Sequence, residues 1–131
     1  MSALDQARVF LIKAREDLDL LEIVASNPKA PDSIFGFHAQ QAVEKAIKSW
    51  IWALGTKPQR THDIEALTAL LVELNGSPIP ELDVLQDIGV FAVLYRYEIF
   101  DWDETIDRSK LIADIALLFA RVENVLSQRD M

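Results

Sequence analysis

The sequence predicts an all-α protein, an up-and-down antiparallel bundle of four to five helices. Apolar residues recur at alternating steps of three and four along most of the chain, as one face of a helix requires, and no stretch alternates with the two-residue period of a strand. The connections between these periodic segments are short, which favours antiparallel neighbours. With 131 residues, 50% of them hydrophobic, the chain fits a single domain over residues 1–131.

The first two helices have the clearest patterns. A stripe of apolar residues over 4–25 predicts the first helix. The second is expected over 34–54, with Asp32 or Ser33 as its N-cap and Gly55 as its stop. At 100° per residue, one side of this second helix forms a core face of Phe35, Ala39, Ala42, Val43, Ala46, Trp50 and Ala53.

Three further helices follow along the chain. Thr61 is the candidate N-cap of the third, the fourth is expected over 81–95, and the fifth begins near Asp103. The broad apolar face of the fifth helix holds Ile112, Ile115, Ala116, Phe119, Val122 and Leu126.

Composition excludes several classes of function. Without cysteine the chain has no disulfide, thiol nucleophile or zinc-thiolate site, and no cofactor or metal is expected. The absence of a signal-like or membrane-length apolar segment favours a soluble cytoplasmic protein with no membrane partner. The net charge of −8 argues against bulk nucleic-acid binding. Between Ser33 and His62, however, a local basic patch sets Lys45, Lys48, Lys57 and Arg60 against the single acid Glu44.

The second helix carries a polar stripe opposite its core face. It consists of His38, Gln41, Lys45 and Lys48, bracketed by Ile34 and Trp52. Glu44 beside it can pair with Lys48 at i,i+4. Three interpretations stay open: a contact with a partner or a second copy, a plain solvent-exposed face, and a ligand site for a phosphate or nucleobase. His62, at the start of the third helix, is either a polar residue closing a loop or a nucleic-acid contact.

A second informative stretch surrounds Arg96, which stands between Tyr95 and Tyr97. Its guanidinium suits a phosphate, and the alternative is an ion pair with a neighbouring acid. The acidic cluster that follows lacks the spacing of an EF-hand loop and suits helix caps better than a metal; it consists of Asp101, Asp103, Glu104 and Asp107.

Together these segments resemble the HEPN domain (higher eukaryotes and prokaryotes nucleotide-binding) over nearly the whole chain. The segment 37–48, FHAQQAVEKAIK, is similar to the signature of the family's second helix. Thr61-His62-Asp63-Ile64 is similar to the start of its third helix, and Leu94-Tyr95-Arg96-Tyr97 to the RY element late in its fourth.

The resemblance implies a helical bundle that forms a homodimer and is paired with a minimal nucleotidyltransferase in a two-component, toxin–antitoxin-like system. It makes the polar stripe, His62 and the segment 95–97 candidate nucleotide- or partner-binding residues. Many HEPN proteins are metal-independent endoribonucleases in which four to six residues separate an arginine from a following histidine. Here the positions after Arg96 hold Asp101, Trp102 and Asp103, so a binding module is favoured over an enzyme, and a ribonuclease using Arg96 is the alternative.

Overall fold

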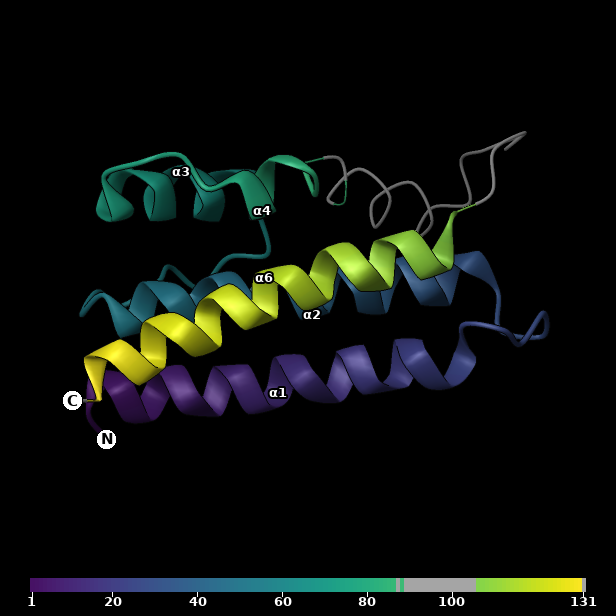
Figure 1. The fold of residues 1–131 in the computed structure, drawn as a ribbon, viewed down its shortest axis with the longest axis horizontal. Coiled ribbons are helices and arrows are strands. Elements are labelled where there is room, and N and C mark those ends of the chain that lie inside the picture. The colour runs from purple at the N-terminus through teal and green to yellow at the C-terminus, as the bar shows by residue number, and fades with distance from the viewer. Residues whose placement is uncertain (87, 89–105, 131) are drawn as a thin grey trace.

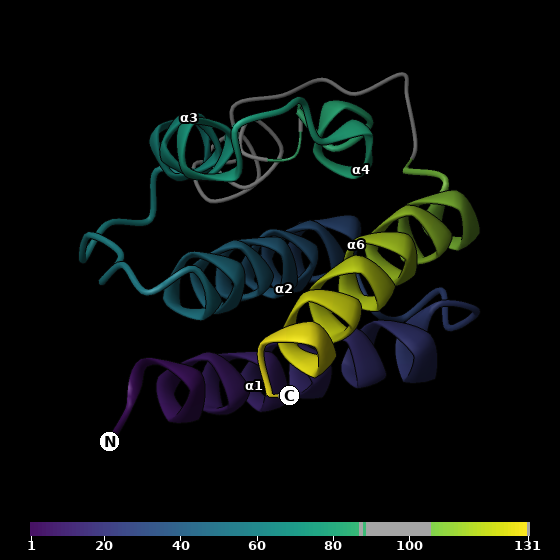
Figure 2. The same cartoon turned by 60° about the vertical axis from the view of Figure 1, so that its left-hand side comes forward.

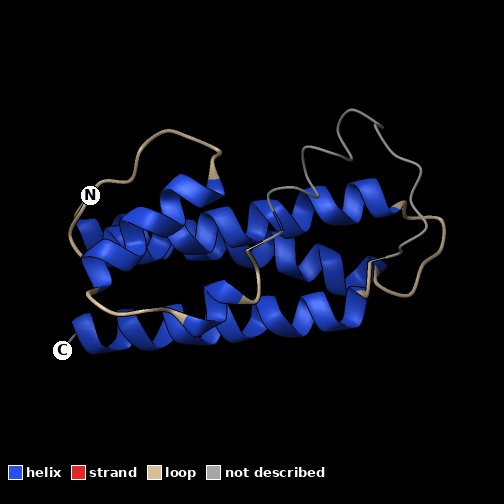
Figure 3. Ribbon diagram, turned by 90° about the horizontal axis from the view of Figure 1, so that it is seen from above, coloured by secondary structure: helices blue, strands red, loops and turns tan. Residues whose placement is uncertain are grey.

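The structure is a computed structural model that describes residues 1–86, 88 and 106–130. These residues form helices joined by turns and loops and contain no strand (Figure 3), which confirms the predicted all-α class. The helices are, in chain order, α1 (Ala3–Val24), α2 (Asp32–Ala53), α3 (Ile64–Asn75), α4 (Pro80–Asp83) and α6 (Arg108–Arg129).

Helix α2 occupies the centre of the bundle. In Figure 1, α1 runs antiparallel along one side of α2 and α6 crosses both, whereas α3 and α4 lie on the other side. Figure 2 shows α3 and α4 as a separate layer above α2. The start of α1, the end of α2 and the end of α6 therefore share one end of the bundle, and the connection from α1 to α2 lies at the opposite end.

The core forms where α1, α2 and α6 meet, and the core face predicted for the second helix is confirmed. Phe35, Trp50 and Phe119 are fully buried, and removing an aromatic or aliphatic side chain of this size from water contributes about 1.5–3 kcal/mol. On α6 the apolar face is rotated slightly from the predicted one, because Ala116 is exposed and Leu118 is buried.

Arg108 ties the first residue of α6 to the α1–α2 connection. Its guanidinium donates to the carbonyl oxygens of Val24 at 3.1 Å and Ala30 at 2.6 Å, and it pairs with the Asp32 carboxylate at 2.8 Å. It also stacks over the Phe35 ring, 5.0 Å from the centroid. One side chain thus satisfies carbonyl groups that the end of α1 and the following loop leave without a helical partner.

Two predicted helix caps are wrong. Pro31 occupies the N-cap position of α2, and because its side chain has no acceptor, no side chain caps the helix; the Asp32 carboxylate binds Arg108. In α3 the cap is Asp63, whose Oδ1 accepts from the backbone N–H of Ala66 at 3.1 Å. Thr61 stands two residues earlier and its hydroxyl accepts from the backbone N–H of Asp63. It therefore supports the loop that leads into α3.

The fourth and fifth helices start and end differently from the prediction. Helix α4 ends at Asp83. The backbone N–H of Leu85 donates to the carbonyl of Leu82 and that of Ile88 to the carbonyl of Leu85, and all three side chains are buried. The rest of the segment predicted as the fourth helix, from 89 to 95, lies outside the described residues. Helix α6 begins at Arg108, later than predicted, because Asp107 caps it by accepting from the N–H of Lys110.

Within the described parts of the chain, no helix combines the length and the apolar character that crossing a bilayer demands.

Candidate functional site

The polar stripe of α2 meets a carboxylate from α1. Asp17 lies in α1 and is 8% exposed. Its Oδ1 is 2.9 Å from Nδ1 of His38, and its Oδ2 is 2.6 Å from the Lys45 ammonium nitrogen. A nearly buried carboxylate is stable only when it is paired and hydrogen-bonded, and both of its oxygens are engaged here. Asp17, His38 and Lys45 therefore form one cluster that links α1 to α2.

A second cluster links α2 to the loop before α3. The Glu44 residue is 3% exposed, and its Oε1 accepts from Nδ1 of His62 at 2.9 Å. Its Oε2 is 3.4 Å from the Lys48 ammonium nitrogen, which confirms the predicted i,i+4 pair. The side chain of His62 is 80% exposed, so this ring stands at the surface while the carboxylate that holds it lies inside.

The two glutamines of the segment 37–48, Gln40 and Gln41, form hydrogen bonds beside the second cluster. Gln40 is buried, and its amide nitrogen donates to the backbone carbonyl oxygen of His62 at 3.4 Å. Gln41 is half-buried and donates to the side-chain oxygen of Gln40 at 3.2 Å. The loop that carries His62 is thus attached to α2 at two points, through Glu44 and through Gln40.

The interpretation of the stripe as a plain solvent-exposed face is wrong. Lys48 is 8% exposed, and Lys45 and Gln41 are half-buried. The reason is the central place of α2, which packs on α1, α3 and α6 and so has little free surface. Of the two residues that bracket the stripe, Ile34 is half exposed, whereas Trp52 packs against the core.

Both histidines present the same chemical arrangement. In a neutral imidazole whose Nδ1 faces a carboxylate, the ring proton sits on Nδ1 and donates to that carboxylate. Nε2 is then an acceptor, and it becomes a donor when the ring is protonated. No group in the described part of the chain hydrogen-bonds the Nε2 of His38 or His62. Among the described residues each Nε2 therefore has no competing partner for a ligand's hydroxyl or phosphate oxygen.

Three of the predicted site residues, Tyr95, Arg96 and Tyr97, lie outside the described residues, as do Asp101, Asp103 and Glu104 of the acidic cluster. The structure brings His38 and Lys45 together at Asp17, and His62 and Lys48 together at Glu44.

Asp17 and Gln40 are the residues that the sequence analysis missed. Asp17 lies three residues after Ala14 and four before Leu21, and both of these are fully buried. This spacing places the Asp17 carboxylate on the apolar side of the first helix, and that position could have indicated a buried, paired acid. Gln40 had no comparable signal, because only the position of the His62 carbonyl explains its burial.

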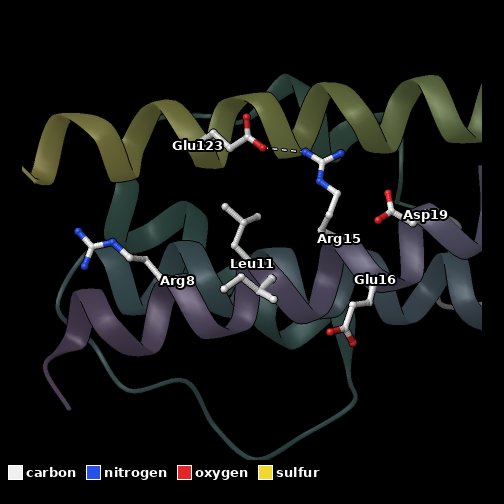
Figure 4. A pocket seen from close by; sticks show the side chains of 7 residues that line it. Arg8, Leu11, Arg15, Glu16, Asp19 and Glu123 are labelled. Atoms are coloured by element: carbon white, nitrogen blue, oxygen red, sulfur yellow. Dashed lines mark hydrogen bonds and ion pairs between the residues drawn. The ribbon is translucent and has the colours of Figure 1, made fainter.

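A shallow groove of about 500 Å³ lies between α1 and α6 and contains none of the predicted site residues. Figure 4 shows Leu11 on its apolar wall and Arg15 reaching across to Glu123 on α6, at 2.7 Å. Arg15 also stacks over the Phe119 ring at 5.0 Å. Ile12 in the same groove is 60% exposed. Arg15 therefore spans this groove from α1 to α6.

The described chain is a small helical bundle with two imidazoles held by carboxylates, His38 on α2 and His62 in the loop before α3. The chain belongs to the HEPN family, because the family model described as HEPN domain matches residues 7–125. This confirms the resemblance and supports a nucleotide-binding or ribonuclease-like module. Comparison with curated protein sequences gives no significant match, and comparison with solved structures gives none either.

Proposed function

We propose that this HEPN protein is a nucleotide- or RNA-binding module that acts as a homodimer and is paired with a minimal nucleotidyltransferase in a two-component, toxin–antitoxin-like system. The observation that carries the proposal is the pair of imidazoles preset by carboxylates, His38 by Asp17 and His62 by Glu44. Rings fixed in this way bind a ligand without first losing side-chain freedom, which favours affinity.

The proposed ligand contacts divide into two groups. His38, His62 and Gln41 offer hydrogen bonds to a nucleotide, and Arg96, flanked by Tyr95 and Tyr97, supplies a guanidinium for phosphate and rings for stacking. The ammonium groups of Lys45 and Lys48 are engaged by Asp17 and Glu44, so these lysines offset the charge of the carboxylates behind the imidazoles.

The two histidines of the chain make a direct test simple. Their ring signals in an NMR spectrum are followed while AMP, ATP or a single-stranded RNA is added. We expect the His62 or His38 signals to shift with one of these ligands and the shift to be weaker in Arg96→Ala. His62→Asn is the matched variant, because its amide retains a donor for Glu44 but has no Nε2. Unchanged ring signals with all three ligands would refute nucleotide binding.

The homodimer is supported by apolar side chains beside His38. Ile34 is 50% exposed and Phe37 is 37% exposed, and the Phe37 ring lies edge-on to the His38 ring at 5.3 Å. Burial of such a patch between copies removes apolar area from water. Sedimentation velocity of Ile34→Glu beside wild type tests this: we expect a dimer for wild type and a monomer for the variant. A wild-type monomer, or an unaffected variant dimer, would contradict this surface.

The nucleotidyltransferase partner is tested separately. A minimal nucleotidyltransferase encoded beside this chain, expressed with it, should co-purify, and Arg96→Ala or His62→Asn should weaken the complex. Failure to co-purify would remove this part of the proposal while leaving nucleotide binding untouched.

One observation favours the alternative, a metal-independent endoribonuclease. The Asp17–His38 pair has the geometry of a carboxylate that orients a general base, and the His38 side chain is 29% exposed. To decide between the two functions, cleavage of RNA is measured in the presence of EDTA. The wild-type protein is compared with Arg96→Ala and His38→Asn. Cleavage that both variants lose would establish the ribonuclease and refute the purely binding role.

A further inference from the structure

The basic patch predicted from the sequence is much smaller in the structure. Most lysines and arginines in the described parts of the chain form a salt bridge, Lys45 and Lys48 among them. Those without a carboxylate of the described chain within 4.0 Å are Lys29, Lys57, Arg60 and Arg129. Lys57 and Arg60 stand out because they belong to one short loop, between α2 and α3.

This loop, residues 55–63, is anchored along its inner side. The backbone N–H of Thr56 donates to the carbonyl of Ile51 at 3.2 Å, and Pro58 is buried. His62 is held through its carbonyl by Gln40 and through its ring by Glu44. The backbone therefore has a fixed course.

The outer side of the same loop is cationic. Lys57 and Arg60 are exposed, and the His62 ring is largely exposed with Nε2 unbonded by any described residue. The nearest acid in sequence is Asp63, whose carboxylate accepts from the Ala66 N–H as the cap of α3. A protein with a net charge of −8 thus has an anchored loop with two cations and one imidazole Nε2 that no described residue pairs with.

We propose that the loop of residues 55–63 is a phosphate-binding surface, on which Lys57, Arg60 and Nε2 of His62 contact the phosphate groups of the bound RNA or free nucleotide. This inference rests on the proposed function and adds to it Lys57 and Arg60, which lie outside the family signature segments at 37–48, 61–64 and 94–97. Guanidinium and ammonium groups form charge-assisted hydrogen bonds with phosphate oxygens, and the fixed backbone lowers the entropy lost on binding.

The test compares variants that change the net charge equally. A fluorescent single-stranded RNA and, separately, ATP are titrated into wild type, Lys57→Gln, Arg60→Gln and Lys29→Gln over a range of salt concentrations. Lys29 is the matched control because it is exposed, has no described carboxylate partner and lies in the α1–α2 connection at the opposite end of the bundle. Thermal melting of each variant establishes that it is folded.

We expect Arg60→Gln to weaken RNA binding about tenfold, as the loss of a charge-assisted hydrogen bond does. Its salt dependence should fall by about 0.7 in log–log slope for the lost phosphate contact, and Lys57→Gln should act in the same direction. Lys29→Gln should bind like wild type. If only RNA binding changes, the phosphates are those of a strand; if ATP binding changes as well, the loop takes a free nucleotide.

Four results would overturn the inference. Equal weakening by Lys29→Gln would show non-specific attraction, and unchanged binding by Lys57→Gln and Arg60→Gln would place the phosphates elsewhere while the proposed function stands. Binding of polyglutamate but of neither RNA nor ATP would assign the loop to an acidic protein partner. Absence of any binding by wild type would refute nucleotide binding itself, which distinguishes that failure from a failure of the loop.

Discussion

Replacement of Asp17 by asparagine tests the first polar cluster most sharply. The asparagine side chain would keep the shape of the aspartate and one acceptor for His38 but would present no negative charge to the Lys45 ammonium, which lies 2.6 Å from the Asp17 carboxylate. Complete loss of one member of a buried ion pair costs about 3–5 kcal/mol, and a hydrogen bond to a charged group contributes about 1.5–3 kcal/mol. Because the side chains of Lys45 and His38 are 28% and 29% exposed, water compensates in part.

We therefore expect Asp17→Asn to lower the free energy of unfolding by about 2–3 kcal/mol. Equilibrium urea unfolding measures this loss. Glu16→Gln is the matched control, since it removes the same charge from the neighbouring position, where Glu16 and Lys13 are 63% and 59% exposed and 3.8 Å apart. That variant should lose less than about 0.5 kcal/mol.

A double-mutant cycle that combines Asp17→Asn with Lys45→Met separates the interaction between these two side chains from the other effects of replacing Asp17. We expect a coupling free energy above about 1 kcal/mol between the positions 17 and 45. The account of a structural Asp17 cluster is refuted if Asp17→Asn loses no more stability than Glu16→Gln, or if the two substitutions in the cycle are additive.

The remaining predictions concern single features of the fold. Arg108→Met should destabilise the protein by about 2–3 kcal/mol, because it removes the donors for Val24 and Ala30, and urea unfolding measures this. Gly76→Ala should cost about 1 kcal/mol in the same assay, since residue 76 has φ +77° at the end of α3; an unchanged midpoint would argue against a left-handed cap. The N–H and hydroxyl of Ser2 lower the pKa of Asp5 below its ordinary 3.8. The stability that this carboxylate contributes is therefore present above pH 3.8 and is lost as the pH falls through its lowered pKa, so the difference between wild type and Asp5→Asn should vanish in acid.

The sequence predicted the helices well where apolar periodicity is strong. The core face of α2 and the stripe of α1 follow directly from residue spacing, because burial of apolar side chains sets the rotation of each helix. The caps were harder. Thr61 and Asp63 are both good N-cap residues, and which of them starts α3 depends on the bonds of His62 to α2.

The candidate site was predicted only in part, for a geometric reason. The stripe of α2 could be read from one helix, but its partners come from other elements. Asp17 meets His38 and Lys45 only because α1 packs antiparallel on α2 in one particular register. The burial of Lys48 likewise depends on the elements packed around α2, which spacing within α2 does not reveal.

The most direct test of the central claim follows the ring signals of the two histidines by NMR during addition of single-stranded RNA and of ATP, in EDTA, with the RNA analysed for integrity at the end of the titration. The account predicts that His62 or His38 shifts on addition of RNA or ATP, that Arg96→Ala weakens this response, and that the RNA stays intact. Unperturbed histidine signals with both ligands would contradict nucleotide binding, and cleaved RNA that Arg96→Ala leaves intact would establish the ribonuclease instead.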